Sequence, residues 1–365
     1  MWNFHNPVAI HAGAGSIASL PQLLAGRRAV LITFPEAAAL GLEQAIAALL
    51  GPQLVAIENN VQPNPDVAWL GAMHERLWQQ HPDVPCLIAL GGGSVIDCAK
   101  AMLAPTPSGR FEELLTHLRQ DSPFQPDPAR LKTLIAIPTT AGTGSEVTPW
   151  ATLWDAAGGH KYSLHRPWTW PEAALIDAEL MRSLPPAATL ASALDALSHA
   201  LEAIWNRHRN PVSSTLAASA ARSILATLPA LMRQPDALAL REQMALAALQ
   251  AGLAFSNTRT ALAHSLSYDI TLRQGVVHGI ACSFSLPHIL RLALGRDAAV
   301  DALLLDIFDA GDAHQAVAGL TAFLEALGVS TDPARYGLGQ GERWDAALQQ
   351  ALQGPRGRNF IAAAS

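Results

Sequence analysis

The stretch that decides the first half of this fold is "LIALGGGSVIDCAKA", from Leu87 to Ala101. A short apolar run ends in three consecutive glycines, and a helical pattern begins at Ser94. Glycines let backbone N–H groups approach a phosphate closely, and the N-terminus of the following helix attracts anions. The stretch therefore predicts a strand, a phosphate-binding turn and a helix. The alternative is a tight turn without a ligand, since the GxGxxG pattern of the usual Rossmann fold is missing.

Similar apolar runs lie on both sides of this stretch, at residues 29–33, 54–58 and 133–138, and Ala- and Leu-rich helical patterns separate them. Alternation of strand and helix is typical of a parallel sheet that helices cover on both faces. Residues 105–131 are rich in Pro, Asp and Ser and predict a long surface connection. We therefore expect an α/β, Rossmann-like architecture in this half of the chain.

A second loop of glycines and hydroxyl residues, "PTTAGTGSE" from Pro138 to Glu146, follows the run at 133–138. Ligands of parallel sheets bind beyond the carboxyl ends of the strands. Two such loops at neighbouring strand ends indicate a site for the pyrophosphate and ribose of a dinucleotide more strongly than either loop alone. A dinucleotide-binding α/β domain is predicted over residues 1–184.

The pattern changes after "SLPP" at residues 183–186. Strand-like runs nearly vanish, and helical periodicity continues through segments such as "ATLASALDALSHALEAIW". An all-helical domain is predicted over residues 185–365.

The composition limits the classes of function. The 365 residues are 50% apolar and 15% charged, with a net charge of −6, which suits a compact globular protein and gives no footprint for nucleic acid or an anionic membrane. No uninterrupted apolar window of membrane-spanning length occurs, and the N-terminus lacks a signal-peptide pattern. Three cysteines form no CxxC pair, which fits a reducing compartment. We expect a cytoplasmic enzyme.

The helical half carries four residues of metal-binding types in a charge-poor setting. Asp195 and His199 stand four residues apart and share one helical face. "ALAHSLSYDITLRQGVVHGIACSF" adds His264 and His278. One carboxylate and three imidazoles form a site suited to a divalent transition metal. The alternative is a surface Asp–His hydrogen bond and core histidines satisfied by hydrogen bonds.

Four motifs in this order, "GGGSVIDCAKA", "PTTAGTGSEVT", "LDALSHALEA" and "VVHGIACSFSLP", resemble the iron-containing alcohol dehydrogenase family. The resemblance extends from "GAGSIASL" near the N-terminus to about residue 290. It implies a dehydroquinate synthase-like two-domain fold and hydride transfer between a nicotinamide and the carbonyl carbon of a small aldehyde. It also implies Fe(II), for which Zn(II) is an alternative, NAD(H) or NADP(H) as cofactor, and a homodimer.

The resemblance also implies roles for individual residues. The implied metal ligands are Asp195, His199, His264 and His278. The implied cofactor contacts are Gly92, Gly93, Ser94, Asp97, Thr139, Thr140, Thr143 and Lys161.

Two positions depart from the family pattern. Phe34 stands where members that prefer NAD carry an acidic residue, so both NAD(H) and NADP(H) stay open. Tyr268 stands where the common form has a second histidine near the nicotinamide. A phenol can donate a hydrogen bond and relay a proton, although its ordinary pKa near 10 makes it a poor base. The alternative for Tyr268 is a packing role.

The segments "AHSLSY", "HGIACSF" and "RGRNF" look most similar to the branch of the family in phosphonate metabolism. That branch implies reduction of phosphonoacetaldehyde to 2-hydroxyethylphosphonate, and a phosphonate needs cationic partners. Five candidates are Arg259, Arg273, His165, Arg166 and Arg358. The alternatives are a general short-chain alcohol dehydrogenase, a dehydroquinate-synthase-like lyase and a non-catalytic metal-binding regulator.

Overall fold

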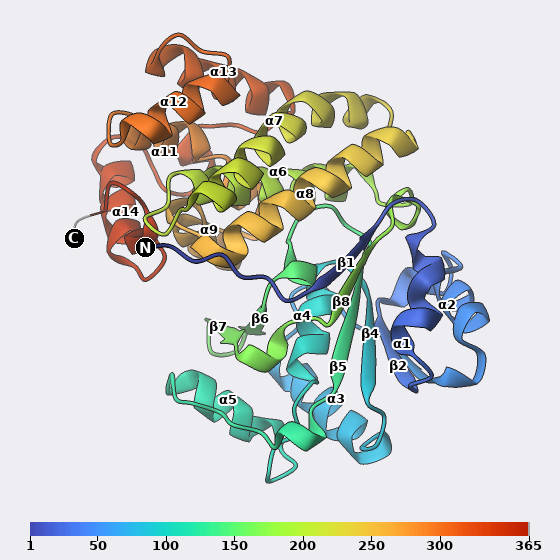
Figure 1. Ribbon diagram of the computed structural model, residues 1–365. Helices are drawn as coiled ribbons and strands as arrows, with labels where there is room; N and C mark the ends of the chain where they lie inside the picture. The colour runs from blue at the N-terminus through green and yellow to red at the C-terminus, as the bar shows by residue number, and fades with distance from the viewer. Residues whose placement is uncertain (364–365) are drawn as a thin grey trace. The chain divides into compact units, whose positions relative to one another are not determined.

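The computed structural model describes residues 1–363, without the Asp269 side chain, and the chain divides into two compact units (Figure 1). The sheet unit comprises Pro7–Thr140 and Ser145–Ser183, and the helical unit comprises the chain from Leu184 together with Met1–Asn6 and Ala141–Gly144. The predicted division has one boundary, after residue 184. The segments Met1–Asn6 and Ala141–Gly144 precede this boundary but group with the helical unit.

The segment Ala141–Gly144 groups with the helical unit because its glycines allow a very close approach. A Cβ atom on Gly142 would lie 2.6 Å from the carbonyl oxygen of Ser192, and one on Gly144 would lie 2.8 Å from the Cα of Gly252. Gly144 also has a φ of +62°, which favours glycine.

The sheet unit contains a six-stranded parallel sheet in the order β1-β8-β5-β4-β2-β3. Its strands are β1 (Ala9–Ala12), β2 (Ala29–Thr33), β3 (Leu54–Glu58), β4 (Cys86–Gly91), β5 (Thr133–Pro138) and β8 (Ala173–Ile176). The parallel sheet is therefore confirmed. The sequence pattern did not identify β1 and β8, because each has only four residues.

Helices cover both faces of this sheet, since alternate side chains of each strand point in opposite directions. The helices are α1 (Leu20–Leu24), α2 (Leu42–Leu50), α3 (Val67–Gln80), α4 (Gly93–Ala101) and α5 (Phe111–Arg119). Leu87 and Leu134 pack in a core with α3, α4 and α5. Ile88 and Ile135 pack on the other face with α1 and α2.

The expected surface connection at residues 105–131 is wrong in part. Helix α5 lies inside it and buries Phe111, Leu114 and Leu115 in the sheet-unit core. The polar residues around these three positions conceal a short amphipathic helix, because apolar spacing over nine residues is a weak signal.

A two-stranded antiparallel sheet, β6 (Trp150–Asp155) and β7 (His160–His165), completes the sheet unit. The buried Lys100 ammonium of α4 fixes the start of β6. Its Nζ donates to the carbonyl oxygens of Ser145 at 2.6 Å and of Trp150 at 2.6 Å. Burial lowers the pKa of Lys100 to about 8. Its three hydrogen bonds compensate for the desolvation of the charge.

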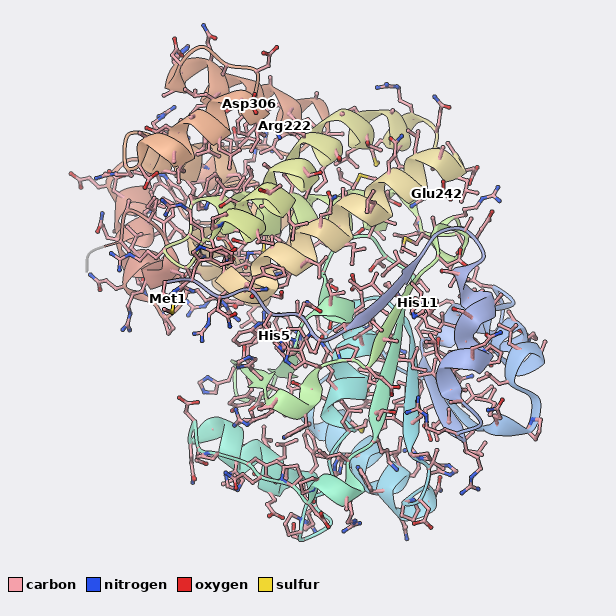
Figure 2. The ribbon with its side chains drawn as sticks, in the orientation of Figure 1. Met1, His5, His11, Arg222, Glu242 and Asp306 are labelled. Carbon is pink, nitrogen blue, oxygen red and sulfur yellow. The ribbon has the colours of Figure 1, made fainter. Side chains whose placement is uncertain are left out.

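The helical unit is built on three long helices, α6 (Pro186–Ile204), α7 (Pro211–Arg233) and α8 (Leu238–Thr258), which pack against one another. The remaining helices are α9 (Leu262–Gln274), α10 (His278–Ser283), α11 (Leu286–Ala293), α12 (Ala298–Ile307), α13 (Ala313–Ala326) and α14 (Glu342–Gln353). The predicted change to helical structure is thus confirmed. An exposed ion pair between Arg222 of α7 and Asp306 of α12 links two of these helices (Figure 2).

Among residues 1–363, only α7 is long and apolar enough to cross a membrane by length and composition. This is weak evidence, because Ala217, Ala221 and Ile224 of α7 pack in the core of the helical unit.

Candidate active site

Three helices of the helical unit bring the predicted metal ligands together. Asp195 and His199 lie one turn apart on α6, His264 lies in the first turn of α9, and His278 begins α10. Asp195 Oδ1 lies 3.4 Å from His264 Nε2, and 3.9 Å from both His199 Nε2 and His278 Nε2. We call these four residues the donor cluster.

The donor cluster fits a bound divalent metal. Asp195 and His264 are each 4% exposed, yet Asp195 Oδ1 and His264 Nε2 have no hydrogen-bond partner among the described residues. A buried polar atom without a partner costs about 1–3 kcal/mol. Ligand atoms at about 2.1 Å from one tetrahedral ion lie about 3.4 Å apart, which is the spacing of these two atoms.

A metal requires a carboxylate and neutral imidazoles, and two cluster residues, Asp195 and His199, have these forms. Burial raises the pKa of Asp195, but the neighbouring His199 and the other cluster histidines outweigh it and hold this pKa below its usual range. Burial lowers the pKa of His199 to about 4, so its imidazole is neutral at pH 7. His264 differs: burial lowers its pKa, but the charges of Cys282 and Glu202 outweigh burial and raise this pKa well above its ordinary value, so a metal bound at His264 displaces a proton.

A buried carboxylate outside the predicted set orients His264. Glu202 of α6 accepts a hydrogen bond from His264 Nδ1 at 2.7 Å, so Nε2 of the same ring faces Asp195. Glu202 also accepts from the backbone N–H groups of Ala261, Ala263 and His264, which fixes the start of α9. The missed signal was the spacing of Asp195, His199 and Glu202, which share one helical face.

Cys282 is a second residue that the sequence analysis missed. It lies on α10 one turn after His278, and it is fully buried. Its Sγ lies 3.6 Å from His278 Nε2. One ligand atom from each of Asp195, His264, His278 and Cys282 lies within 4.8 Å of the other three.

An arginine that the sequence analysis did not single out, Arg356, lies over the ring of Tyr268. The guanidinium of Arg356 lies 4.4 Å from the centroid of the Tyr268 ring, a cation–π contact. Tyr268 is one helical turn after His264 on α9, and Arg356 is close enough to Glu202, the hydrogen-bond partner of His264, for its carboxylate to raise the pKa of Arg356. Burial lowers the pKa of Arg356 to about 10, partly offset by the Glu202 carboxylate, and Arg356 stays cationic at neutral pH.

Backbone contacts position Arg356. A Cβ atom on the next residue, Gly357, would lie 1.9 Å from the carbonyl oxygen of Ala351 on α14, so only glycine allows this close approach. Ser265 of α9 donates to the same carbonyl oxygen at 2.9 Å. The C-terminal segment is thus joined to the helix that carries Tyr268.

The cationic residues predicted from the sequence are divided between the two units. Arg259, Arg273 and Arg358 are exposed in the helical unit, and Arg358 Nε donates to the carbonyl oxygen of Gln353. In the sheet unit, His165 stacks on Trp150 at a centroid distance of 3.9 Å, and Arg166 donates to the carbonyl oxygen of Ser122. Arg356, which was not predicted, contacts Tyr268, one helical turn after His264 on α9.

The two predicted nucleotide-binding loops meet in the sheet unit. Gly92, Gly93 and Ser94 follow β4 and open α4, while Thr139 and Thr140 follow the neighbouring β5. The N–H of Thr139 donates to the carbonyl oxygen of Gly91 at 3.1 Å. A Cβ atom on Gly92 would lie 3.2 Å from Thr140 Cγ2, so the loops touch.

The other predicted cofactor residues have structural contacts. Asp97 accepts hydrogen bonds from Ser145 Oγ at 2.6 Å and from the N–H of Thr152 at 2.8 Å, which secures β6 to α4. Lys161 on β7 lies over the Trp154 ring at 4.9 Å. Thr143 belongs to the segment that groups with the helical unit.

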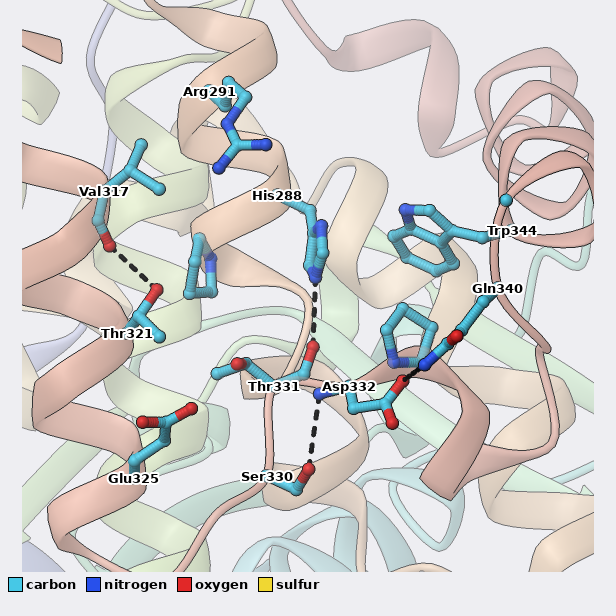
Figure 3. A pocket seen from close by; sticks show the side chains of 13 residues that line it. His288, Arg291, Val317, Thr321, Glu325, Ser330, Thr331, Asp332, Gln340 and Trp344 are labelled. Carbon is cyan, nitrogen blue, oxygen red and sulfur yellow. Dashed lines mark hydrogen bonds between the residues drawn. The ribbon is translucent and has the colours of Figure 1, made fainter. Parts of the chain in front are cut away.

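A separate cavity of about 490 Å³ in the helical unit contains none of the donor cluster. Figure 3 shows two of the hydrogen bonds in its lining: His288 Nε2 meets the carbonyl oxygen of Thr331, and Gln340 donates to Asp332.

Comparisons with known proteins agree with this geometry. Residues 7–178 match the family model described as iron-containing alcohol dehydrogenase, and residues 189–363 match the model for the C-terminal part of the Fe-containing alcohol dehydrogenase family. The NAD-dependent methanol dehydrogenase of Bacillus methanolicus is 32% identical over 295 residues, which are 79% of this chain and 75% of that protein.

Two further similar proteins are named as reductases of an acetaldehyde that carries an anionic group. The phosphonoacetaldehyde reductase of Streptomyces viridochromogenes is 36% identical over 205 residues, 56% of this chain and only 52% of that protein. The crystal structure of sulfoacetaldehyde reductase from Bifidobacterium kashiwanohense in complex with NAD+ superposes with a TM-score of 0.88 and 26% identity, covering 99% of this chain and 94% of that chain.

Proposed function

Because this chain belongs to the iron-containing alcohol dehydrogenase family, we propose that it reduces a small anionic aldehyde to its primary alcohol, specifically phosphonoacetaldehyde to 2-hydroxyethylphosphonate. Family membership makes it an iron- and nicotinamide-dependent alcohol dehydrogenase or aldehyde reductase. The proposal concerns its substrate and the residues that act on it.

Asp195, His199, His264 and His278 are the residues that would hold the iron. Bound iron supplies Lewis-acid polarisation of a carbonyl oxygen, and bound nicotinamide supplies the hydride. The chain's own contribution is position: Glu202 fixes the tautomer and ring orientation of His264. The turn at Gly92–Ser94, which opens α4, offers backbone N–H groups to the phosphates of the dinucleotide.

The observation that carries the substrate proposal is Arg356 on the ring of Tyr268. A guanidinium beside the donor cluster can pair with a charged group at the far end of a two-carbon aldehyde. Two of the relatives are named for aldehydes that end in a phosphonate or a sulfonate. The competing candidate is a reductase of neutral short-chain aldehydes, for which the methanol dehydrogenase relative is the precedent.

Arg356→Met is expected to lower kcat/KM for phosphonoacetaldehyde by about 10- to 100-fold, because hydrogen bonds to a charged group contribute about 1.5–3 kcal/mol. The value for neutral propanal should change by less than about threefold, since no charge is paired there. Steady-state kinetics with both aldehydes measures the ratio. Arg296→Met, the same charge change at an exposed arginine of the helical unit outside the predicted substrate residues, is the matched control.

Two results would contradict the proposal. Equal kcat/KM of the unmodified enzyme for phosphonoacetaldehyde and propanal would remove the phosphonate as the preferred substrate. An equal loss for both aldehydes in Arg356→Met would assign Arg356 to the scaffold of α9 instead.

Tyr268→Phe is expected to lower kcat for both aldehydes by about tenfold or more, because Tyr268 is proposed to relay the proton to the product alkoxide. Phenylalanine keeps the ring on which Arg356 rests, so the ratio between the two aldehydes should stay constant. Near-normal turnover in this variant would instead leave Tyr268 a packing role.

A further inference from the structure

We propose that Cys282 is a metal ligand, which makes the centre a mixed nitrogen, oxygen and sulfur site for a thiophilic divalent ion such as Zn(II). The proposal rests on the assignment of Asp195, His264 and His278 as ligands. Cys282 would be a fifth possible donor beside the four residues of the donor cluster. In a four-coordinate site with Asp195, His264 and His278, the fourth ligand is then either His199 or Cys282, depending on the metal.

The geometry favours shared ligation by His278 and Cys282. Both lie on one face of α10, one turn apart. With Zn–N bonds of about 2.0–2.1 Å and a Zn–S bond of about 2.3 Å, nitrogen and sulfur ligands of one tetrahedral ion lie about 3.6 Å apart. Cys282 Sγ lies 3.6 Å from His278 Nε2 and 3.8 Å from His278 Nδ1, so the sulfur is beside the ring. Shared ligation therefore needs a rotation of the imidazole that turns Nε2 toward the ion.

Tight backbone packing fixes this face of α10 against α6. A Cβ atom on Gly279 would lie 1.8 Å from the carbonyl oxygen of Ala191, so only glycine allows the two helices to approach this closely. Ala191 lies one turn before Asp195 on α6. The same contact therefore brings both His278 and Cys282 to Asp195.

The surroundings of Cys282 differ from those of the other two cysteines. Cys86 Sγ lies 3.5 Å from the carbonyl oxygen of Leu87, and Cys98 Sγ lies 3.5 Å from Met73 Sδ, both in the apolar core of the sheet unit. Cys282 is instead surrounded by the ligand atoms of Asp195, His264 and His278. A soft sulfur donor among imidazoles suits zinc.

Binding through Cys282 replaces the S–H bond with a metal–sulfur bond and releases the proton to solvent, without any change of oxidation state. His199 is the alternative fourth donor: it stacks between Phe255 at 4.0 Å and His264 at 4.6 Å. A harder ion is expected to use His199, whereas zinc uses the thiolate.

Zinc X-ray absorption spectroscopy on the full chain, reconstituted with one equivalent of Zn(II), tests the proposal. We expect one sulfur ligand at about 2.3 Å beside nitrogen and oxygen ligands at about 2.0 Å. The sulfur should vanish in Cys282→Ser or Cys282→Ala, with at least a tenfold loss of zinc affinity in chelator competition. Cys98→Ser, a buried thiol in the sheet unit, is the matched control and should keep the sulfur ligand.

Bound zinc with only nitrogen and oxygen ligands in the unmodified protein would overturn the role of Cys282 and leave the donor cluster intact. Failure to bind zinc at all would overturn the cluster assignment as well. Aldehyde reduction by the iron-loaded enzyme is measured separately, so the failure of the proposed function is distinguishable from either result.

Discussion

Replacing His264 with alanine is expected to abolish stoichiometric metal binding and to lower kcat/KM for aldehyde reduction by about a hundredfold or more. His264 Nε2 lies 3.4 Å from Asp195 Oδ1, closer than the Nε2 atoms of His199 and His278, and it has no hydrogen-bond partner among residues 1–363. Lewis-acid stabilisation of developing charge contributes several kcal/mol, and each 1.4 kcal/mol or so corresponds to a factor of ten in rate. Elemental analysis after reconstitution and steady-state kinetics measure the two effects.

His288→Ala provides the matched control for this variant. His288 is a histidine of the same unit, on α11, but it lines the separate cavity and meets the carbonyl oxygen of Thr331 at 3.0 Å. We expect it to retain one metal per chain and nearly full activity. Stoichiometric metal and more than a tenth of the activity in His264→Ala would show that the cluster is a hydrogen-bonded core instead.

Glu202→Gln is expected to lower metal affinity by about 10- to 100-fold, although Glu202 is not itself in the donor cluster. The carboxylate accepts four hydrogen bonds, from His264 Nδ1 and from three backbone N–H groups. An amide has one acceptor oxygen, so its NH2 group must face donors. If that NH2 donates to Nδ1, His264 takes the tautomer with a proton on Nε2, which cannot bind a metal.

The same substitution should also lower the free energy of unfolding of the metal-free chain by about 1–3 kcal/mol, because buried donors at the start of α9 lose their acceptor. Chelator competition measures metal affinity, and urea unfolding measures stability. Glu146→Gln is the control: Glu146 is also buried, with its pKa raised to about 7 by burial, but it belongs to the sheet unit. Unchanged metal affinity in Glu202→Gln would contradict the positioning role.

Local patterns in the sequence were sufficient to predict much of the architecture. The four strands β2 to β5 are apolar runs bounded by Gly, Pro or polar residues, and their repeat with helical segments predicts a parallel sheet. The metal-binding residue types were also visible, because polar side chains in charge-poor helices stand out. Short elements such as α5 and β1 were missed, since few residues give a weak periodic signal.

What only the tertiary structure decided is which distant side chains meet. Glu202 and His264 are 62 residues apart, and Arg356 reaches Tyr268 from the far end of the chain. Periodicity shows which face of a helix is buried but not which face of another helix it meets. That pairing depends on close backbone approaches, such as Gly279 against Ala191. The sequence determined the fold class and predicted the four residues of the donor cluster. Helix packing decided which other residues orient and surround these four.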